Sequence, residues 1–239
     1  MRPLSGASLL SAWEQGQSQH PVDRALTLLA AGWPEASFEE LAGLSIGRRD
    51  ARLLALRRAT FGEVLRGFVS CPVCAEALEL ELRTSELLLQ DPEVDAGGDF
   101  TMTVDGRDLR FRLPDSRDLA AAAVCAGAEE ASARIADRCF LATTTGDPPP
   151  AALTAALATA MAAADPQADL SLALRCAACA HEWSDALDVQ GFFWSEIDAA
   201  AVRLLDDVDR LARVYGWSEA EILAMSPRRR RRYLELAGR

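Results

Sequence analysis

The amino-acid sequence predicts an α+β protein: a small zinc-ribbon-like antiparallel β-module with an inserted hairpin and helices, flanked by N- and C-terminal helices. Two Cys-x-x-Cys pairs, Cys71/Cys74 and Cys176/Cys179, lie next to segments in which every second residue is apolar, as in half-buried strands. At both ends of the chain the apolar residues instead recur every three or four positions, as in amphipathic helices.

The predicted organisation has three parts. An N-terminal helical segment covers residues 1–68, the β-module covers 69–191, and a C-terminal helical tail covers 192–239. A helical insertion at about 115–165 interrupts the β-module. The chain has 239 residues, 50% of them hydrophobic, and can therefore bury a core in one elaborated domain or two small ones.

The N-terminal segment contains predicted helices with clear ends. Apolar residues recur at helical spacing over 21–31, and Gly32-Trp33-Pro34 ends that helix. Ser37 and Glu40 have the spacing of a capping box and should begin the next helix. A further helix is expected over 48–61.

Strands are predicted beside both cysteine pairs and in a separate hairpin. The alternating segments are 78–82, 100–104, 109–113, 170–174 and 183–189. Asp105-Gly106, between two of them, favours the tight turn of a β-hairpin. The first cysteine pair precedes its strand, and the second pair lies between two strands.

The insertion and the tail are predicted to be helical. Inserted helices are expected at 115–127, 129–140 and 151–164, with a stiff linker at 146–150. Residues 194–215 have the period of one long amphipathic helix, which Gly216 ends. Ser218 and Glu221 begin a short helix by a capping box, and Pro227 begins the last one.

Charge and hydropathy restrict the partners. A net charge of −11 and a pI near 4.7 argue against a general nucleic-acid binder, because phosphate contacts need a clustered positive field. No apolar run reaches the roughly 20 residues of a membrane span, and no signal peptide is recognisable. We expect a cytoplasmic protein whose partners are proteins, with no nucleic acid, membrane or small-molecule substrate.

The two cysteine pairs are the motif that carries chemistry. A Cys-x-x-Cys knuckle directs two thiolates at one metal, and two knuckles complete the tetrahedral shell of a structural zinc. Disulfides are not expected in a reducing cytosol. We therefore predict one structural zinc, bound by Cys71, Cys74, Cys176 and Cys179. The gap between the pairs exceeds ordinary ribbon spacing, which an insertion explains.

Several alternatives to this zinc site stay open. The cysteine pairs could have lost their metal, or they could be redox-active, although neither has the βαβ context of a thioredoxin-like motif. His181 could replace a missing ligand, but a histidine that donates to a nearby carbonyl or faces solvent is the favoured interpretation. Cys125 and Cys139 have no knuckle spacing and are expected to be small buried apolar residues.

No catalytic constellation is recognisable, so we expect no enzymatic activity. His20 and His181 are the only histidines, and nucleophile-elbow and phosphate-loop motifs are absent. The run 228–232 is five consecutive arginines. On a helix such a run points all round the axis and forms no single phosphate-reading face, which favours protein docking or intramolecular pairing.

Two stretches carry a family resemblance. These are IGRRDARLLALRRATFGEVL, upstream of CPVC, and the C-terminal part from residue 169, in which YGWSEAEILAMSPRRRRRYLEL is the most specific. The chain resembles small baseplate proteins of contractile phage tails and contractile injection systems, similar to tailed-phage baseplate hub assembly proteins, often described as assembly chaperones. The resemblance spans 21–236 and is densest from Cys176 onward.

The resemblance implies other baseplate or tail proteins as partners and no catalysis. The first hypothesis is therefore an assembly factor or structural component of such a baseplate, with permanence in the particle left open. The alternative is a zinc-ribbon adaptor in transcription or RNA metabolism. An adaptor would need a basic ribbon face, whereas the loops ACAHEWSD and CAEALELEL are acidic.

The last two helices contain more large apolar residues than they can bury between themselves. They are Trp217, Ile222, Leu223, Tyr233 and Leu234. We expect these side chains to dock on a baseplate partner, as helix anchors in a groove. The alternative is that they fold back on the long helix.

Overall fold

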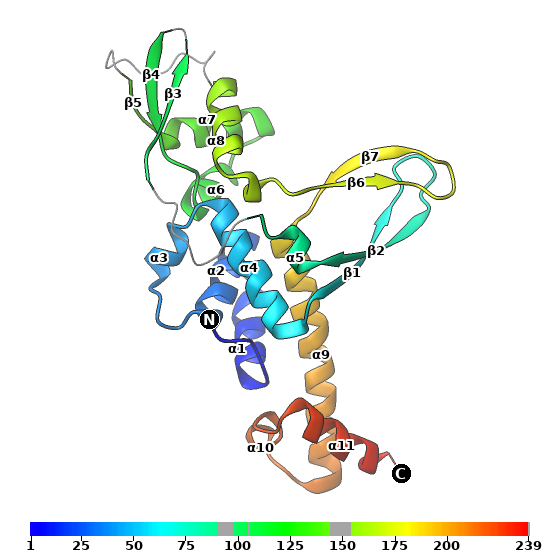
Figure 1. Cartoon of the computed structure of the whole chain (residues 1–239). Coiled ribbons are helices and arrows are strands. Elements are labelled where there is room, and N and C mark those ends of the chain that lie inside the picture. The colour runs from blue at the N-terminus through cyan, green and yellow to red at the C-terminus, as the bar shows by residue number, and fades with distance from the viewer. Residues whose placement is uncertain (90–97, 105, 144–153, 239) are drawn as a thin grey trace.

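A computed structural model describes residues 1–89, 98–104, 106–143 and 154–238. Within these ranges helices form the main body, and small antiparallel sheets lie beside it (Figure 1). The predicted α+β class is confirmed. The predicted turn residue Asp105 and the linker at 146–150 lie outside the described ranges.

Helices at the N-terminus form one half of the main body. They are α1 Ala7–Gly16, α2 Pro21–Gly32, α3 Phe38–Ala42 and α4 Ile46–Phe61. Pro21 is in the first turn of α2, and Ser37 and Glu40 form the predicted capping box of α3. The bounds of α1 were not predicted from the sequence, and its Leu9 and Leu10 are buried in the main core.

The long helix α9, Val189–Tyr215, forms the other half of the main body (Figure 1). Its buried residues Phe193, Ile197 and Ala201 pack among the N-terminal helices. The first half of the predicted C-terminal helical tail, residues 192–239, is therefore part of the main core. Asp188 caps α9 by accepting the N–H of Gly191, so the helix begins before the predicted boundary.

The first hairpin consists of β1, Val64–Ser70, and β2, Ala77–Arg83, and is followed by α5, Thr84–Leu87. The prediction that the helical segment extends to residue 68 is wrong, because α4 ends at Phe61 and β1 follows it. Leu65, Gly67 and Val69 lie on the inward side of β1. Because Gly67 has no side chain, the alternation of apolar residues that would predict this strand is interrupted in the sequence.

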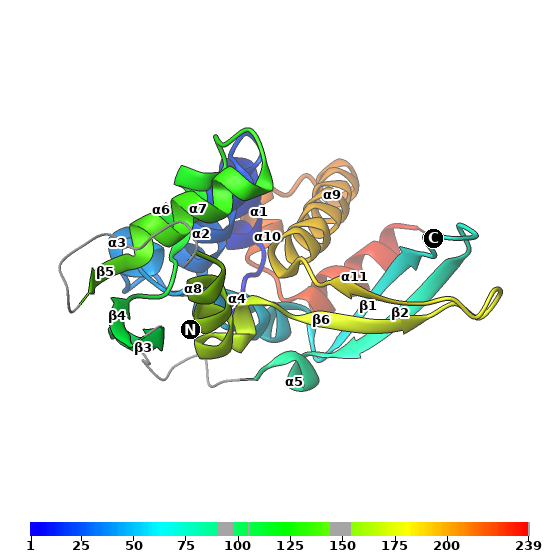
Figure 2. The same cartoon turned by 90° about the horizontal axis from the view of Figure 1, so that it is seen from above.

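The second hairpin consists of β6, Ser171–Arg175, and β7, Glu182–Ala186, as predicted around the second cysteine pair. The two hairpins extend side by side from the main body in both views (Figures 1 and 2). Leu80 of the first hairpin and Leu174 of the second line a small apolar cavity of about 140 Å³ between them. Each hairpin thus covers the other's apolar face.

A buried ion pair holds the first hairpin on the main body. Arg57 of α4, whose side chain is 3% exposed, pairs with Glu196 of α9 at 2.6 Å. The same guanidinium donates to the carbonyls of Gly62 and Val64, where β1 begins. One side chain therefore fixes two helices and the start of the hairpin, since each of its bonds is charge-assisted.

The inserted module, residues 98–165 as far as they are described, separates the hairpins in sequence. It contains β3 Phe100–Val104, β4 Arg107–Phe111, α6 Ser116–Ala122, α7 Ala128–Cys139, β5 Phe140–Thr143 and α8 Thr154–Ala164. The predicted β3–β4 hairpin is confirmed. The strand β5 was not predicted, because four residues directly after a helix are too few to show a period. Phe111, Ala136 and Leu157 are buried in a small core of this module.

The two ends of the inserted module are tied together beside α4. Gln167, in the 3₁₀ helix Pro166–Ala168, accepts the N–H of Leu89 at 2.7 Å and donates to the carbonyl of Leu87 at 3.0 Å. Buried Asp165 accepts the N–H of Gly47 at 2.8 Å. The chain therefore leaves and re-enters the hairpin region at nearly the same place.

The C-terminal helices α10, Glu219–Leu223, and α11, Pro227–Ala237, fold back on the end of α9 (Figure 1). Gly216 turns the chain at φ 69°, in the left-handed region that favours glycine. Ser218 and Glu221 form the predicted capping box, and Pro227 is in the first turn of α11.

The five expected partner-docking residues pack to different degrees within this chain. Ile222 is completely buried within this chain, and Leu223 is half-buried against the main core. Trp217 and Tyr233 pack edge-to-face at 4.8 Å, and Leu234 is half-buried on the same side of α11. Because α9 provides the surface that two short helices lack, these residues fold back and Ile222 is inaccessible to a partner.

Candidate metal centre

The two cysteine pairs form turns of the same geometry at the tips of the two hairpins. In the first turn Cys71 N–H donates to the carbonyl of Glu76 at 2.9 Å, and Ala75 N–H donates to the carbonyl of Cys71 at 2.9 Å. The corresponding bonds of the second turn, from Cys176 and Ala180, measure 2.8 and 3.0 Å. The sequence therefore builds one knuckle twice.

Each knuckle places an alanine in the left-handed region. Ala75 has φ 60° and Ala180 has φ 58°, and they are the only non-glycine residues with positive φ among those described. An alanine there costs energy that glycine would not. This shared backbone lets the two cysteines of each pair point to the same side of the turn.

The four predicted cysteine ligands converge, although the two pairs are far apart in sequence. Their sulfur atoms all lie within 4.8 Å of one another, and Cys71, Cys74, Cys176 and Cys179 are what we call the cysteine cluster. The Sγ atoms of Cys71 and Cys179 are 3.7 Å apart, and those of Cys74 and Cys176 are 3.5 Å apart. Each close pair joins one hairpin to the other.

These dimensions fit a four-thiolate metal shell. A tetrahedral ion with metal–sulfur bonds of about 2.3 Å separates its sulfurs by about 3.8 Å, close to the two cross-hairpin distances. Cys71 and Cys176 are buried, whereas Cys74 and Cys179 are exposed at the tips. The cluster is thus half-shielded, with all four positions of a tetrahedron supplied by protein.

The knuckle backbone favours the thiolate form that a metal needs. Burial alone would raise the pKa of Cys71, but hydrogen bonds from the N–H groups of Cys74 and Val73 lower it to about 7. The N–H of Glu76 also favours the thiolate of Cys74, but hydrogen bonds with the Cys176 and Cys179 thiols outweigh it and raise that pKa to about 12. A metal bound to these thiolates would displace thiol protons.

The remaining candidates lie outside the cluster. His181 stacks on Trp183 with ring centroids 5.9 Å apart, and the cysteine cluster does not include it. Cys139 is fully buried and Cys125 is half-buried. Cys139 thus agrees with its expected role as a small buried residue.

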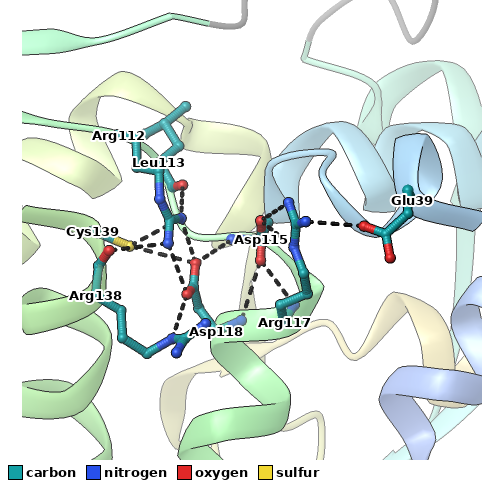
Figure 3. Close-up of polar contacts among 8 residues, drawn as sticks. All are labelled: Glu39, Arg112, Leu113, Asp115, Arg117, Asp118, Arg138 and Cys139. Atoms are coloured by element: carbon teal, nitrogen blue, oxygen red, sulfur yellow. Dashed lines mark hydrogen bonds and ion pairs between the residues drawn. The ribbon is translucent and has the colours of Figure 1, made fainter.

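A second polar cluster lies in the inserted module and centres on Asp118, which is fully buried (Figure 3). Arg112 donates to both of its carboxylate oxygens, at 2.5 and 2.9 Å, and Arg138 donates at 2.7 Å. Burial alone would raise the pKa of Asp118, but hydrogen bonds from Arg112, the Asp115 N–H and Arg138 hold it well below its usual range. From the sequence, only the start of a helix was predicted at this place.

The same cluster disfavours ionisation of the Cys139 thiol. Its thiol lies 3.6 Å from Asp118 (Figure 3), and burial together with that negative charge raises the pKa of Cys139 to about 12. The thiolate form that nucleophilic chemistry requires is therefore strongly disfavoured at neutral pH. We assign this network a structural role.

An adjoining bridge connects the inserted module to the main body. Arg117 pairs with Asp115 at 2.8 Å and reaches Glu39 of α3 at 3.2 Å (Figure 3). Arg112 and Arg117 also line an open cleft of about 1020 Å³. Arg112 pairs with Asp118, and Arg117 pairs with Asp115. The positive charges of these two arginines are therefore already compensated and are not available to a ligand in the cleft.

Neither a membrane-spanning helix nor a similarity to known proteins adds to the description of the site within the described residues. In the described part of the chain, no helix combines the length and the apolar character needed to cross a bilayer. No protein-family model, curated protein or solved structure matches the chain.

Proposed function

We propose that this chain is a non-catalytic assembly factor or structural component of the baseplate of a contractile injection system or phage-like tail, held in shape by one structural zinc ion. The observation that carries the zinc assignment is the convergence of four cysteine sulfurs at the tips of two hairpins. The baseplate assignment is supported by the resemblance of the sequence around and beyond these cysteines.

Zinc is the metal that this donor set favours. Four thiolates in a tetrahedron are typical of structural zinc sites, and such a shell leaves no position for water or substrate. The metal would then link two hairpins that share no backbone hydrogen bonds within the described residues. On this proposal the ribbon-like module is a rigid projection from the helical body.

The proposal of a scaffold also agrees with the other polar groups. The carboxylate of Asp118 and the thiol of Cys139 are buried. Asp118 accepts hydrogen bonds from Arg112 and from Cys139, so neither group faces a substrate-sized opening as a catalytic group would. The zinc-saturated cluster would supply no Lewis acid with a free site. These arrangements support a protein that acts by binding other proteins.

The adaptor alternative is less well supported. The exposed side of the hairpins includes Glu79, Glu81 and Glu182. Its arginines Arg66 and Arg175 are within ion-pair distance of Glu81 and Glu182, at 3.0 and 3.7 Å. A face of this charge repels nucleic-acid phosphates instead of binding them.

The zinc proposal is tested by elemental analysis of protein purified without added metal. We expect one zinc per chain, little zinc in Cys176→Ser, and unchanged zinc in the matched control Cys125→Ser, because Cys125 lies outside the cluster. A wild-type zinc content near zero, or full zinc in Cys176→Ser, would disprove it.

The baseplate proposal is tested in a cell that makes the particles. If sheath, tube and baseplate genes flank this gene, deleting it should abolish sheathed particles in electron micrographs, and expression of the intact chain should restore them. Normal particles after deletion would show that the chain has no assembly role. A gene that lies among transcription or ribosomal genes would favour the adaptor instead.

A further inference from the structure

The terminal helix α11 is a strongly basic element of an acidic protein. Residues 227–239 contain six arginines and a single acidic residue, Glu235, whereas the whole chain has a net charge of −11. At about 100° per residue, the half-buried positions Arg230, Tyr233, Leu234 and Ala237 share one side of the helix. The remaining arginines lie on the opposite side.

The packing of α11 fixes which arginines face outward. Arg230 pairs with Asp207 of α9 at 3.1 Å, and its side chain is only 11% exposed. Tyr233 packs against Tyr215 and Trp217. With this side held on α9, the exposed residues Arg228, Arg229, Arg231 and Arg232 fan over an arc of about 160°. Five arginines in sequence thus produce a four-arginine outer face, here called the α11 arginine face.

These four arginines make few side-chain interactions with the described residues of the chain. Among the described residues Arg228 and Arg231 make no side-chain hydrogen bond or ion pair. Arg232 reaches only Glu235, in a pair exposed on both sides, and Arg229 lies over the Tyr233 ring. The face is therefore available to a partner.

The placement of these charges does not help the helix itself. The first turn of α11 contains no acidic residue, and the arginines begin at its second position. Positive side chains near a helix N-terminus are disfavoured by the helix dipole. The stability of the helix therefore does not explain the arginines at its start, whereas binding of an external anion would explain them.

We propose that the α11 arginine face binds a carboxylate-rich segment of a protein partner. This deepens the proposed function, on which it rests, by naming the chemistry of the partner's surface. Arg230 already shows the favoured pairing, since it holds a carboxylate of its own chain. Guanidinium groups bind carboxylates through geometrically matched hydrogen bonds, and exposed Leu236 adds apolar contact beside them.

Nucleic acid is the less favoured anion. Binding to phosphates weakens steeply as the salt concentration rises, and four arginines can neutralise only a few phosphates. The remainder of the chain is strongly acidic and would repel a long polyanion. A short acidic protein segment avoids that repulsion because it contacts only the helix.

The test uses the full-length zinc-loaded chain and a fluorescein-labelled oligoglutamate peptide, with binding followed by fluorescence anisotropy at physiological salt. The variant R228Q/R231Q/R232Q should bind on the order of tenfold more weakly, since it removes three exposed charge contacts. The matched control R66Q/R134Q/R203Q changes three exposed arginines elsewhere by the same total charge. It should change affinity less than about twofold. Circular dichroism should show that both variants fold.

Each other outcome contradicts the proposal. Equal weakening of peptide binding in both variants would mean that only the overall charge of the protein matters. If the wild type does not bind oligoglutamate, the proposal of an acidic partner is wrong. Tighter binding to duplex DNA that depends on the same arginines would assign the face to nucleic acid. A wild-type dimer in light scattering that R228Q/R231Q/R232Q abolishes would assign it to a second copy.

Failure here is separable from failure of the proposed function. If oligoglutamate does not bind but particles still need the chain, only the α11 inference is wrong. If gene deletion leaves particles normal while the peptide binds through α11, the acidic partner stands and the baseplate assignment falls.

Discussion

At the residue scale, single side chains in unusual environments carry much of the specificity of this molecule. Ala75 and Ala180 have positive φ at the same position of the two cysteine knuckles. Asp118 is a fully buried carboxylate that two arginines hold. Both features concern backbone or charge states that are unfavourable in isolation and persist because neighbouring groups compensate.

The first prediction concerns the knuckles. Ala75→Gly and Ala180→Gly should each stabilise the protein by about 1 kcal/mol, because glycine relieves the left-handed strain. The matched control Ala77→Gly lies in the extended strand β2 and should destabilise by about 0.5–1 kcal/mol. Thermal unfolding in excess zinc measures all three. If the knuckle variants lose stability as the control does, the strain is absent.

The second prediction concerns Asp118. Asp118→Asn should lower the free energy of unfolding by about 2–3 kcal/mol, because it weakens the charge-assisted hydrogen bonds of partly exposed Arg112 and Arg138 to a buried carboxylate. Asp209→Asn removes a half-exposed partner of Arg213 and should cost less than about 1 kcal/mol. Urea unfolding of both variants compares them, and similar losses would contradict a central role for Asp118.

The same carboxylate predicts a pH dependence. Because its folded-state pKa lies below the unfolded value of about 3.9, ionised Asp118 contributes stability at higher pH that is lost as pH falls. The difference in unfolding free energy between wild type and Asp118→Asn should therefore shrink below about pH 4. Acid loss of metal affects both proteins and cancels in this difference. A constant difference would show that Asp118 does not titrate in this way.

At the element scale, α9 organises the molecule. It packs on the N-terminal helices along its first half and on α10 and α11 at its end. The C-terminal helices are short and amphipathic, so in isolation they would be marginal. Their order comes from the surface that α9 offers, which is also what leaves the α11 arginine face outward.

The third prediction follows from this packing. Ile222→Ala should destabilise by about 2–5 kcal/mol, because Ile222 is completely buried. The control Leu236→Ala, at a position 40% exposed, should change stability by less than about 1 kcal/mol. Denaturant unfolding distinguishes the two. Equal small effects would mean that the C-terminal helices leave α9 easily and that partner docking through Ile222 remains available.

At the scale of the whole molecule, the described residues form two hydrophobic cores and one cysteine cluster. The main core joins α1, α2, α4 and α9, and the inserted module has its own core. The cysteine cluster lies away from both, at the hairpin tips. The metal and the helical body should therefore respond separately to perturbation.

The fourth prediction is the effect of metal removal. If the cluster holds the proposed zinc, a chelator should increase hydrogen exchange at the tips of β1, β2, β6 and β7, because the cluster joins those tips. Exchange within the buried part of α9 should stay slow, since its core contacts involve no cysteine of the cluster. Global loss of protection would show that the metal supports the entire fold.

The sequence by itself determined the features that depend on neighbours along the chain. The caps at Ser37 and Ser218, the turn at Gly216, the β3–β4 hairpin and the two cysteine knuckles could all be predicted, because each depends on local hydrogen bonds and side-chain spacing. The four cysteines that the sequence predicts to converge do lie close together. Gly67 hid the strand β1, and β5 was too short to show a period.

Only the tertiary structure decided what depends on contacts between distant segments. Gln167 and Asp165 close the inserted module so that the two knuckles meet, α9 becomes core instead of tail, and Ile222 turns inward. Asp118 receives arginines from two other segments. Periodicity tells which side of an element is apolar, but the partner that covers it is chosen by long-range packing, whose energy no local pattern encodes.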